Sequence, residues 1–218
     1  MAILLHLETS TKVCSVALSK DGELHAMEEL EEAGYSHGEN LTIFIERVLE
    51  KAHISMNELS GISVASGPGS YTGLRIGVST AKGLCYSLKI PLIAIDSLSA
   101  LAALDNSDQT KCAVIDARRM EVYNCFFDAD GKKLKEISAD IIDEDSYREF
   151  EPFTYFGDGA QKLEEVWKDR NCTINSEIKS SAKGQVKIAY QKFQNSDFED
   201  VAYFEPFYLK DFIAGKKA

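Results

Sequence analysis

The sequence has 218 residues, a hydrophobic content of 44% and a formal net charge of −11. Because so acidic a surface repels nucleic-acid phosphates, the composition argues against tight independent binding of RNA or DNA. No run approaches the ~18 consecutive apolar residues of a membrane helix, and the apolar start of the chain is too short for a secretory signal. We therefore expect a cytoplasmic protein that makes no contact with a membrane.

The first half of the chain predicts an alternation of strands and helices. Short apolar runs indicate strands, and the Asp21-Gly22 turn joins the second and third of them as a hairpin. Ser36 and Glu39 have the spacing of a capping box, which predicts the start of the first helix. The expected order is three strands, a helix, a strand, a helix, a strand and a helix, at residues 2–7, 14–19, 23–30, 36–52, 61–66, 70–88, 90–95 and 96–104.

The beginning of the chain recurs about half-way along it, after a polar linker at residues 105–111. Residues 3–24 and 112–134 each contain an apolar strand that ends in an acid, Glu8 or Asp116, followed by a second strand and an Asp-Gly turn. This recurrence predicts a duplicated α/β lobe. Two unrelated hairpins are the alternative.

We therefore expect two lobes, at residues 1–106 and 107–218. In the second lobe, residues 153–167 predict a strand, a glycine turn and a helix, and a later helix is expected at residues 181–194. The aromatic segment at 201–213 is expected to be docked rather than free, with packing back on the first lobe as one option.

A glycine-rich run, ASGPGSYTGLRIG at residues 65–77, lies between a predicted strand and a predicted helix. It lacks the lysine and the hydroxyl residue of a P-loop, and its glycine spacing is one residue too long for a dinucleotide fingerprint. The N-terminus of the following helix could still attract an anion. The better interpretation is structural: a tight turn at 67–69, a helix cap at Ser70 or Thr72, and a flat helix face for close packing. That face is formed by Gly73, Gly77 and Ala81.

The motifs of common hydrolases are missing from the sequence. The four histidines include no pair at i, i+4 and no H-E-x-x-H, and there is no G-x-S-x-G elbow, so a metallopeptidase is rejected. We expect no catalytic residue and no bound metal. The five cysteines are scattered and odd in number, and we interpret them as small apolar residues in a reducing compartment. They are Cys14, Cys85, Cys112, Cys125 and Cys172.

Four segments together resemble one family: LETSTKVCSVAL, SGPGSYTGLRIGVSTAKGL, IPLIAIDSL and IDARRMEVY. They are similar to the TsaB family, formerly YeaZ, whose members belong to the tRNA threonylcarbamoyladenosine-modification proteins. The resemblance is strong in the first half of the chain and continues to the FGDGA segment around Gly157. It implies an α/β protein of the actin-like ATPase (ASKHA) fold, with two ribonuclease-H-like lobes built on mixed sheets.

The resemblance also implies a function that the residues alone do not indicate. TsaB is regarded as the non-catalytic partner of its paralogue TsaD, which transfers threonylcarbamoyl to an adenosine beside the tRNA anticodon, and TsaE, an ATPase, joins them. On this basis we expect no cofactor in the chain itself, with ATP and metal on the partner subunits and tRNA reached only through the complex. A homodimer of the free chain is also compatible with the resemblance.

The sequence departs from the catalytic paralogue at its metal site. TsaD carries a metal-binding His-x-x-x-His motif, and the two histidine positions fall here on Ser97 and Leu101. Neither residue can hold a catalytic metal, and we expect Leu101 to pack in the core.

The nucleotide cleft implied by the fold is degraded as well. The first hairpin that would grip phosphates, at residues 8–11, keeps small hydroxyl residues, but the second, at residues 116–120, has no glycine and two arginines. We expect those arginines to fill a vestigial cleft. Its residues are Glu8, Thr11, Asp116, Arg118 and Gly159. The alternative function is an ATP-binding small-molecule kinase or ATPase of the same fold, using Glu8, Thr11, Asp116 and Gly159.

Helical phase predicts a partner surface on the first two helices. Because residues advance ~100° per position, the apolar stripe from Leu41 to Ala52 faces the core while Ile43 points away from it. The outward side of the second helix combines apolar and small residues, whereas a solvated face should be polar. We expect both helices to pair with two helices of TsaD; the alternative is that Ile76 and Tyr86 cover an element of the same lobe. The predicted surface comprises Ile43, Arg47, Arg75, Ile76, Ser79, Gly83 and Tyr86.

Overall fold

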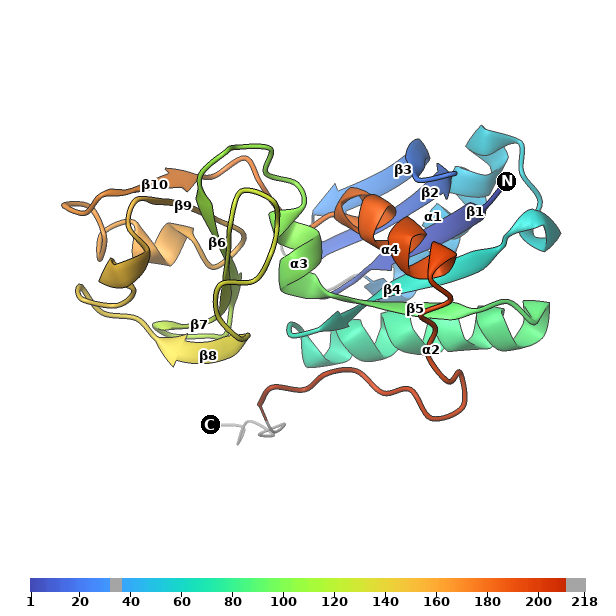
Figure 1. Cartoon of the computed structure of the whole chain (residues 1–218). Coiled ribbons are helices and arrows are strands. Elements are labelled where there is room, and N and C mark those ends of the chain that lie inside the picture. The colour runs from blue at the N-terminus through green and yellow to red at the C-terminus, as the bar shows by residue number, and fades with distance from the viewer. Residues whose placement is uncertain (32–36, 211–218) are drawn as a thin grey trace, which may run out of the picture.

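The computed structural model describes residues 1–31 and 37–210, which form two lobes lying side by side (Figure 1). Each lobe is built on one five-stranded mixed sheet. The capping box predicted for Ser36 and Glu39 includes a residue outside these ranges. Within them, no helix is long and apolar enough to cross a membrane.

The first sheet has the strand order β3-β2-β1-β4-β5. Strands β1, β2 and β3 pair antiparallel, whereas β1, β4 and β5 pair parallel. The bounds are β1 Ile3–Glu8, β2 Val13–Lys20, β3 Glu23–Glu31, β4 Gly61–Gly67 and β5 Leu92–Asp96. The order of strands and helices predicted for the first half of the chain is therefore confirmed.

The second sheet has the strand order β10-β9-β6-β7-β8 and repeats the topology of the first. Strands β6, β7 and β8 pair antiparallel, and β6, β9 and β10 pair parallel. The bounds are β6 Thr110–Asp116, β7 Glu121–Phe127, β8 Ser138–Ile141, β9 Phe153–Phe156 and β10 Cys172–Asn175. The duplication predicted from the sequence is therefore confirmed for the strand topology, but no α-helix lies between β6 and β10, a stretch that the structure describes throughout, so the second copy lacks the helices of the first.

Helices cover both faces of the first sheet (Figure 1). On one face, α1 (His37–Ala52) and α2 (Tyr71–Leu88) bury their apolar stripes against the strands. On the other face lies α4 (Val186–Gln194), whose Ala189 joins a buried cluster with the sheet. The short α3 (Ser97–Ala102) packs against β6 and β7 and so connects the two lobes.

The strands of the two sheets lie on opposite sides of the predicted boundary between residues 106 and 107. The chain nevertheless returns to the first lobe after β10. The helix expected at 181–194 consists of a 3-10 turn, η4 (Ala182–Gln185), followed directly by α4, and both contact the first sheet.

The prediction of a helix after the glycine turn in residues 153–167 is wrong. The chain instead forms the 3-10 turn η3 (Gln161–Leu163) and further tight turns up to Trp167, most of them closed by i→i−3 hydrogen bonds. Leu163 and Trp167 are both buried, and this i, i+4 pattern cannot distinguish a helix from successive turns. The indole of Trp167 packs edge-on against Phe153 and Tyr155, with ring centroids 5.5 and 5.0 Å away, so an aromatic core replaces a helical cover. Two more 3-10 turns are present in the part of the chain that the structure describes, η1 Met56–Glu58 and η2 Arg148–Phe150.

Buried hydrogen bonds attach η4 to the first sheet. The two ring nitrogens of His6 lie 2.7 Å from the hydroxyls of Ser63 and Ser19. Ser63 donates to Gln185 Oε1 at 2.7 Å, and Gln185 Nε2 donates to the Leu7 carbonyl at 2.9 Å. Burial lowers the pKa of His6 to about 3, so the imidazole is neutral in the folded protein.

Candidate functional site

The glycine-rich run places the start of α2 directly on the turn between β1 and β2. A Cβ atom on Gly73 would lie 2.0 Å from the Thr9 carbonyl oxygen, and one on Gly77 would lie 2.3 Å from Thr9 Oγ1. One on Gly69 would lie 2.3 Å from the carbonyl oxygen of Ser10. These distances are far below van der Waals contact, so the glycines permit the close packing that the sequence analysis favoured.

Hydrogen bonds fix this junction. Thr9 Oγ1 donates to the Gly73 carbonyl at 2.8 Å, and the Ser70 amide donates to the Ser10 carbonyl at 2.6 Å. Ser70 is also the N-cap of α2, because its hydroxyl accepts a bond from the Gly73 amide at 3.2 Å. The β1–β2 turn, which is the first of the two hairpins expected to grip phosphates, is therefore hydrogen-bonded to the glycine-rich run.

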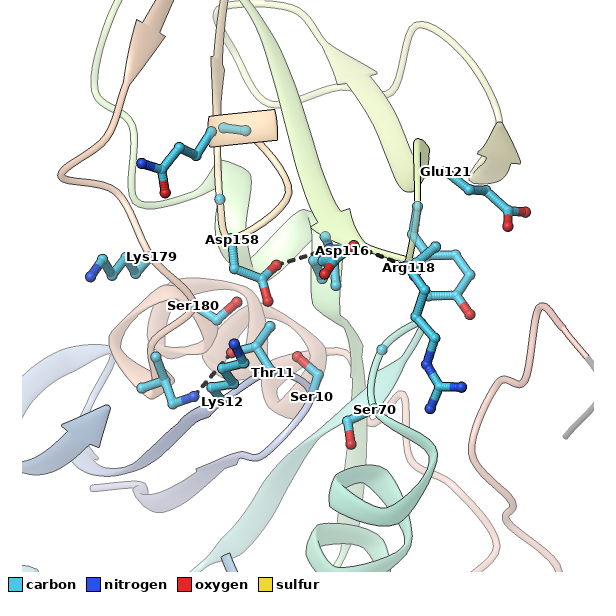
Figure 2. Close-up of a pocket in the computed structure, with 18 of the residues that line it drawn as sticks. Ser10, Thr11, Lys12, Ser70, Asp116, Arg118, Glu121, Asp158, Lys179 and Ser180 are labelled. Carbon is cyan, nitrogen blue, oxygen red and sulfur yellow. Dashed lines mark hydrogen bonds between the residues drawn. The ribbon is translucent and has the colours of Figure 1, made fainter. Parts of the chain in front are cut away.

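A cavity of about 1210 Å³ separates the lobes at this junction (Figure 2). The first lobe contributes the β1–β2 turn and the start of α2, and the second contributes the β6–β7 turn and the segment after β9. Of the residues predicted for the cleft, Thr11, Asp116 and Arg118 line this cavity. Glu8 and Gly159 lie behind its wall.

The position of Glu8 follows from its hydrogen bonds. Its carboxylate is buried and accepts bonds from the Ser10 amide at 2.7 Å and the Ser10 hydroxyl at 2.6 Å. Burial raises the pKa of Glu8, against the opposing effect of those bonds. Gly159 packs against the end of β6, since a Cβ atom there would lie 3.1 Å from the Asp116 amide nitrogen.

Asp116 and Asp158 line the second-lobe side of the cavity, and Lys162 lies beside Asp116. Asp158 accepts a hydrogen bond from the Asp116 amide at 3.0 Å, and Figure 2 shows its carboxylate directed toward the β6–β7 turn. Burial raises the pKa of Asp158. Lys162 forms an ion pair with Asp116, so the acid that resembles a nucleotide-site carboxylate already has a cationic partner.

The β6–β7 turn does not have the form of a phosphate-binding loop. Arg118 and Arg119 both adopt left-handed backbone conformations, with φ of 73° and 51°. Such conformations cost a non-glycine residue ~1–3 kcal/mol each. The turn brings two exposed guanidinium groups into the cavity lining in place of glycine amides.

The positions of the paralogue's metal ligands lie in α3. Leu101 is buried in the cluster between α3 and the second sheet, which confirms the expectation that it packs in the core. Its Cδ2 would lie 2.7 Å from a Cβ atom on Gly157. Ser97 is the first residue of α3 and is also buried. In residues 1–31 and 37–210, no cluster of three or more His, Cys, Asp or Glu side chains could hold a metal ion.

The predicted partner surface lies on the outward sides of α1 and α2. The Tyr86 side chain is 81% exposed and Ile43 is 42% exposed. A Cβ atom on Gly83 would meet no heavy atom within 4 Å. Ile76 differs, because it is half-buried and packs against the core of its own lobe. Arg47, Arg75 and Ser79 are exposed.

The sequence analysis missed Asp158 and Lys162. Asp158 lies in the FGDGA segment that carries part of the family resemblance, so that segment was an available signal. Lys162 gave no local signal, because its partner Asp116 is distant in sequence, at the end of β6.

Comparison with solved structures defines the class of protein. YeaZ from Pseudomonas aeruginosa aligns over 96% of this chain and 100% of its own, with a TM-score of 0.80 and 23% identity. The activator of 2-hydroxyisocaproyl-CoA dehydratase from Clostridium difficile, solved with bound ADPNP, aligns over 89% and 97%, with a TM-score of 0.54 and 9% identity. The chain is thus an α/β protein of the actin-like ATPase fold.

Sequence comparison gives the family. A family profile described as "TsaD: tRNA N6-adenosine threonylcarbamoyltransferase" matches residues 31–215. The Escherichia coli (strain K12) "tRNA threonylcarbamoyladenosine biosynthesis protein TsaB" is 27% identical over 98% of this chain and 97% of its own length. The chain belongs to this family, on its TsaB (YeaZ) branch.

Proposed function

We propose that this chain is the non-catalytic partner of a TsaD homologue in the threonylcarbamoyladenosine modification of tRNA next to the anticodon. The chain scaffolds a complex with TsaD and TsaE homologues, and tRNA is held through that complex. ATP and metal act on the partner subunits. The names of the relatives support the part of the proposal that concerns tRNA modification, and the surface of α2 supports the proposed mode of association.

The outward side of α2 is the observation that carries this proposal. Tyr86 is almost entirely in solvent, and Gly83 leaves an open notch one turn away from it. Small residues in the middle of an apolar helix face let a second helix approach closely. Since Ile43 of α1 is also exposed on this side of the lobe, we infer a four-helix contact with the paralogue. A second copy of this chain would be the competing occupant.

The interior of the cleft supports a role without chemistry. Leu101 fills a position where the paralogue binds metal, and Lys162 pairs with Asp116. The β6–β7 turn offers arginine side chains rather than a glycine loop of amide donors. These features favour a scaffold over the alternative kinase or ATPase.

Gly83→Trp tests the contact. A Cβ atom at this exposed position meets no heavy atom within 4 Å, so the variant is expected to fold, while the indole fills the notch that a partner helix needs. Lys187→Trp is the matched control, because it places the same ring on an exposed position of α4, on the opposite face of the sheet. Ile76 is less suitable because it is half-buried.

Gel filtration of each variant with the TsaD homologue of the same organism gives the readout. The wild type and Lys187→Trp are expected to co-elute with the paralogue at micromolar concentration, and Gly83→Trp to elute separately with an unchanged circular dichroism spectrum. Co-elution of Gly83→Trp would contradict this contact, and failure of the wild type to co-elute would contradict the proposed function itself.

A further inference from the structure

The segment from Glu199 to Lys210, which we call the C-terminal strap, runs beside α2 and then toward the second lobe (Figure 1). It has almost no regular secondary structure. Its path is fixed at its start by the Glu199 amide, which donates to the Leu92 carbonyl on the edge strand β5 at 2.9 Å. Val201 and Phe204 then pack against the core of the first lobe.

A second set of contacts holds the strap to α2. Lys82 Nζ donates to the carbonyls of Ala202 at 3.2 Å and Phe204 at 2.8 Å. Further along, the Tyr208 ring lies on the Tyr71 ring with centroids 4.7 Å apart. The strap is therefore attached at both the middle and the first turn of the helix that carries the predicted partner surface.

The end of β4 provides a third attachment. The Phe207 amide donates to the Ser66 carbonyl at 2.7 Å. Gly67 has φ of +110°, and a Cβ atom there would lie 2.5 Å from the Phe207 carbonyl oxygen. The first glycine of the glycine-rich run thus makes room for the strap.

The strap ends on the other lobe. Lys210 forms an ion pair with Glu121, the first residue of β7. Phe207, Tyr208 and Lys210 line the cavity between the lobes. The strap also borders a second cavity of about 850 Å³, and Phe207 lines both cavities.

The strap and the predicted partner surface each carry an exposed tyrosine ring near Lys82. Tyr203, between the two carbonyls that Lys82 holds, is 84% exposed, and Tyr86 is 81% exposed one helical turn from Lys82. A helix seated against α2 at Tyr86 would therefore lie close to the part of the strap that Lys82 holds. Arg75, also on the predicted surface, lies over the Tyr71 ring at 5.4 Å, next to Tyr208.

We propose that the C-terminal strap couples the partner-binding side of α2 to the width of the cleft between the lobes. It does so through its attachments to the first lobe at Lys82, Ser66 and Tyr71 and through its ion pair with Glu121 on the second lobe. The part concerning the partner rests on the proposed function, whereas the restraint on the lobes holds in the free chain. Each lobe is a rigid packed unit, so a tie from one to the other limits their relative rotation.

Distances between spin labels test the restraint in the full-length free chain. The labels are placed at Thr72→Cys in the first turn of α2 and Ile141→Cys on β8, both exposed, in a Cys172→Ser background because the other cysteines are buried. Lys82→Met removes the ammonium that holds the strap, and Glu121→Gln removes the acceptor on the second lobe. Lys168→Met is the control, since it breaks an exposed pair with Glu165 far from the strap.

A single narrow distance distribution is expected for the wild type and for Lys168→Met. Glu121→Gln is expected to give a broader distribution with a longer mean. Lys82→Met is expected to give a smaller change in the same direction, because Phe207 and Tyr208 still hold the strap to the first lobe; both variants keep the circular dichroism spectrum of the wild type. A Glu121→Gln distribution that coincides with the wild type, or a larger change in Lys82→Met than in Glu121→Gln, would overturn the proposal.

Addition of the TsaD homologue tests the coupling. The partner is expected to shift the label distance in the wild type and to leave it unshifted in Glu121→Gln, which still co-elutes with the partner because its α2 surface is intact. An equal shift in both would overturn the coupling. If the wild type fails to co-elute, the proposed function fails, while the free-chain distances still decide whether the strap restrains the lobes.

Discussion

Replacing Gly73 by alanine tests whether the glycine-rich run exists for packing. The new Cβ atom would lie 2.0 Å from the Thr9 carbonyl oxygen and 3.2 Å from His37 Cδ2. The first distance is about 1.5 Å shorter than an ordinary non-bonded contact, so α2 has to move away from the β1–β2 turn. Both obstructing groups are held in place, the first being backbone and the second a buried ring.

The expected cost follows from three contributions. Overpacking that shifts backbone costs ~1–3 kcal/mol. Loss of the Thr9–Gly73 hydrogen bond costs about 1 kcal/mol, and alanine in a helix returns ~0.5–1 kcal/mol relative to glycine. We therefore expect Gly73→Ala to lower the free energy of unfolding by about 2 kcal/mol, which with an m-value of about 2 kcal/mol/M lowers the urea midpoint by about 1 M.

Gly83→Ala is the matched control on the same helix. Its Cβ atom meets nothing within 4 Å, so only the helix-propensity gain of ~0.5–1 kcal/mol remains and the variant should be more stable than the wild type. Circular dichroism at 222 nm follows α1 and α2, whereas the single tryptophan, Trp167, follows the second lobe, so the two signals together locate the effect. If Gly73→Ala is as stable as Gly83→Ala, the packing argument is refuted.

Three further predictions concern pH, nucleotide and metal. The pKa of His6 is about 3 in the folded protein and near 6.5 in the unfolded chain, so the unfolded chain binds one more proton at pH values between them. The free energy of unfolding is therefore highest above pH 6.5 and falls as the pH drops, by about 2 kcal/mol at pH 5. Urea titrations of the wild type and His6→Gln from pH 8 to pH 4.5 check this, since the difference between their slopes isolates His6, and parallel curves would argue against it. Calorimetry with Mg-ATP is expected to give no saturable heat at micromolar protein, because Arg118 and Arg119 replace glycine amides and Lys162 already neutralises Asp116; saturable binding would revive the kinase alternative. Elemental analysis after mild purification should find no stoichiometric zinc or iron, because Ser97 and Leu101 cannot bind metal, and one metal per chain would contradict that reasoning.

Local patterns predicted the first lobe well because its elements are regular and each has its own signal. The strand runs, the Asp21-Gly22 turn and the apolar stripe of α1 are each recognisable within a short stretch of sequence. The repeat of the β1–β2 hairpin was also enough to predict the duplicated topology. In the second lobe the same logic failed, because Leu163 and Trp167 satisfy a helix pattern while the chain forms tight turns.

The candidate site was predictable only where a single segment carries it. Thr11, Asp116 and Arg118 lie in the two hairpins and do line the cavity. Contacts between distant segments gave no signal in the sequence, and these include the pair of Lys162 with Asp116 and that of Lys210 with Glu121. Charge pairing over such separations depends on the folded topology, which periodicity does not encode.

The return of the chain to its first sheet has a consequence for synthesis on the ribosome. The last strand of that sheet ends at Asp96, but the helix that covers its second face begins only at Val186. Until α4 emerges, an apolar sheet face that includes Leu4 and Ile93 stays exposed to water. The hydrogen bonds that connect His6 through Ser63 to Gln185 are also incomplete. A nascent chain paused before Val186 therefore presents an incompletely folded lobe with an exposed apolar face. Such intermediates bind chaperones and aggregate when chaperones are scarce.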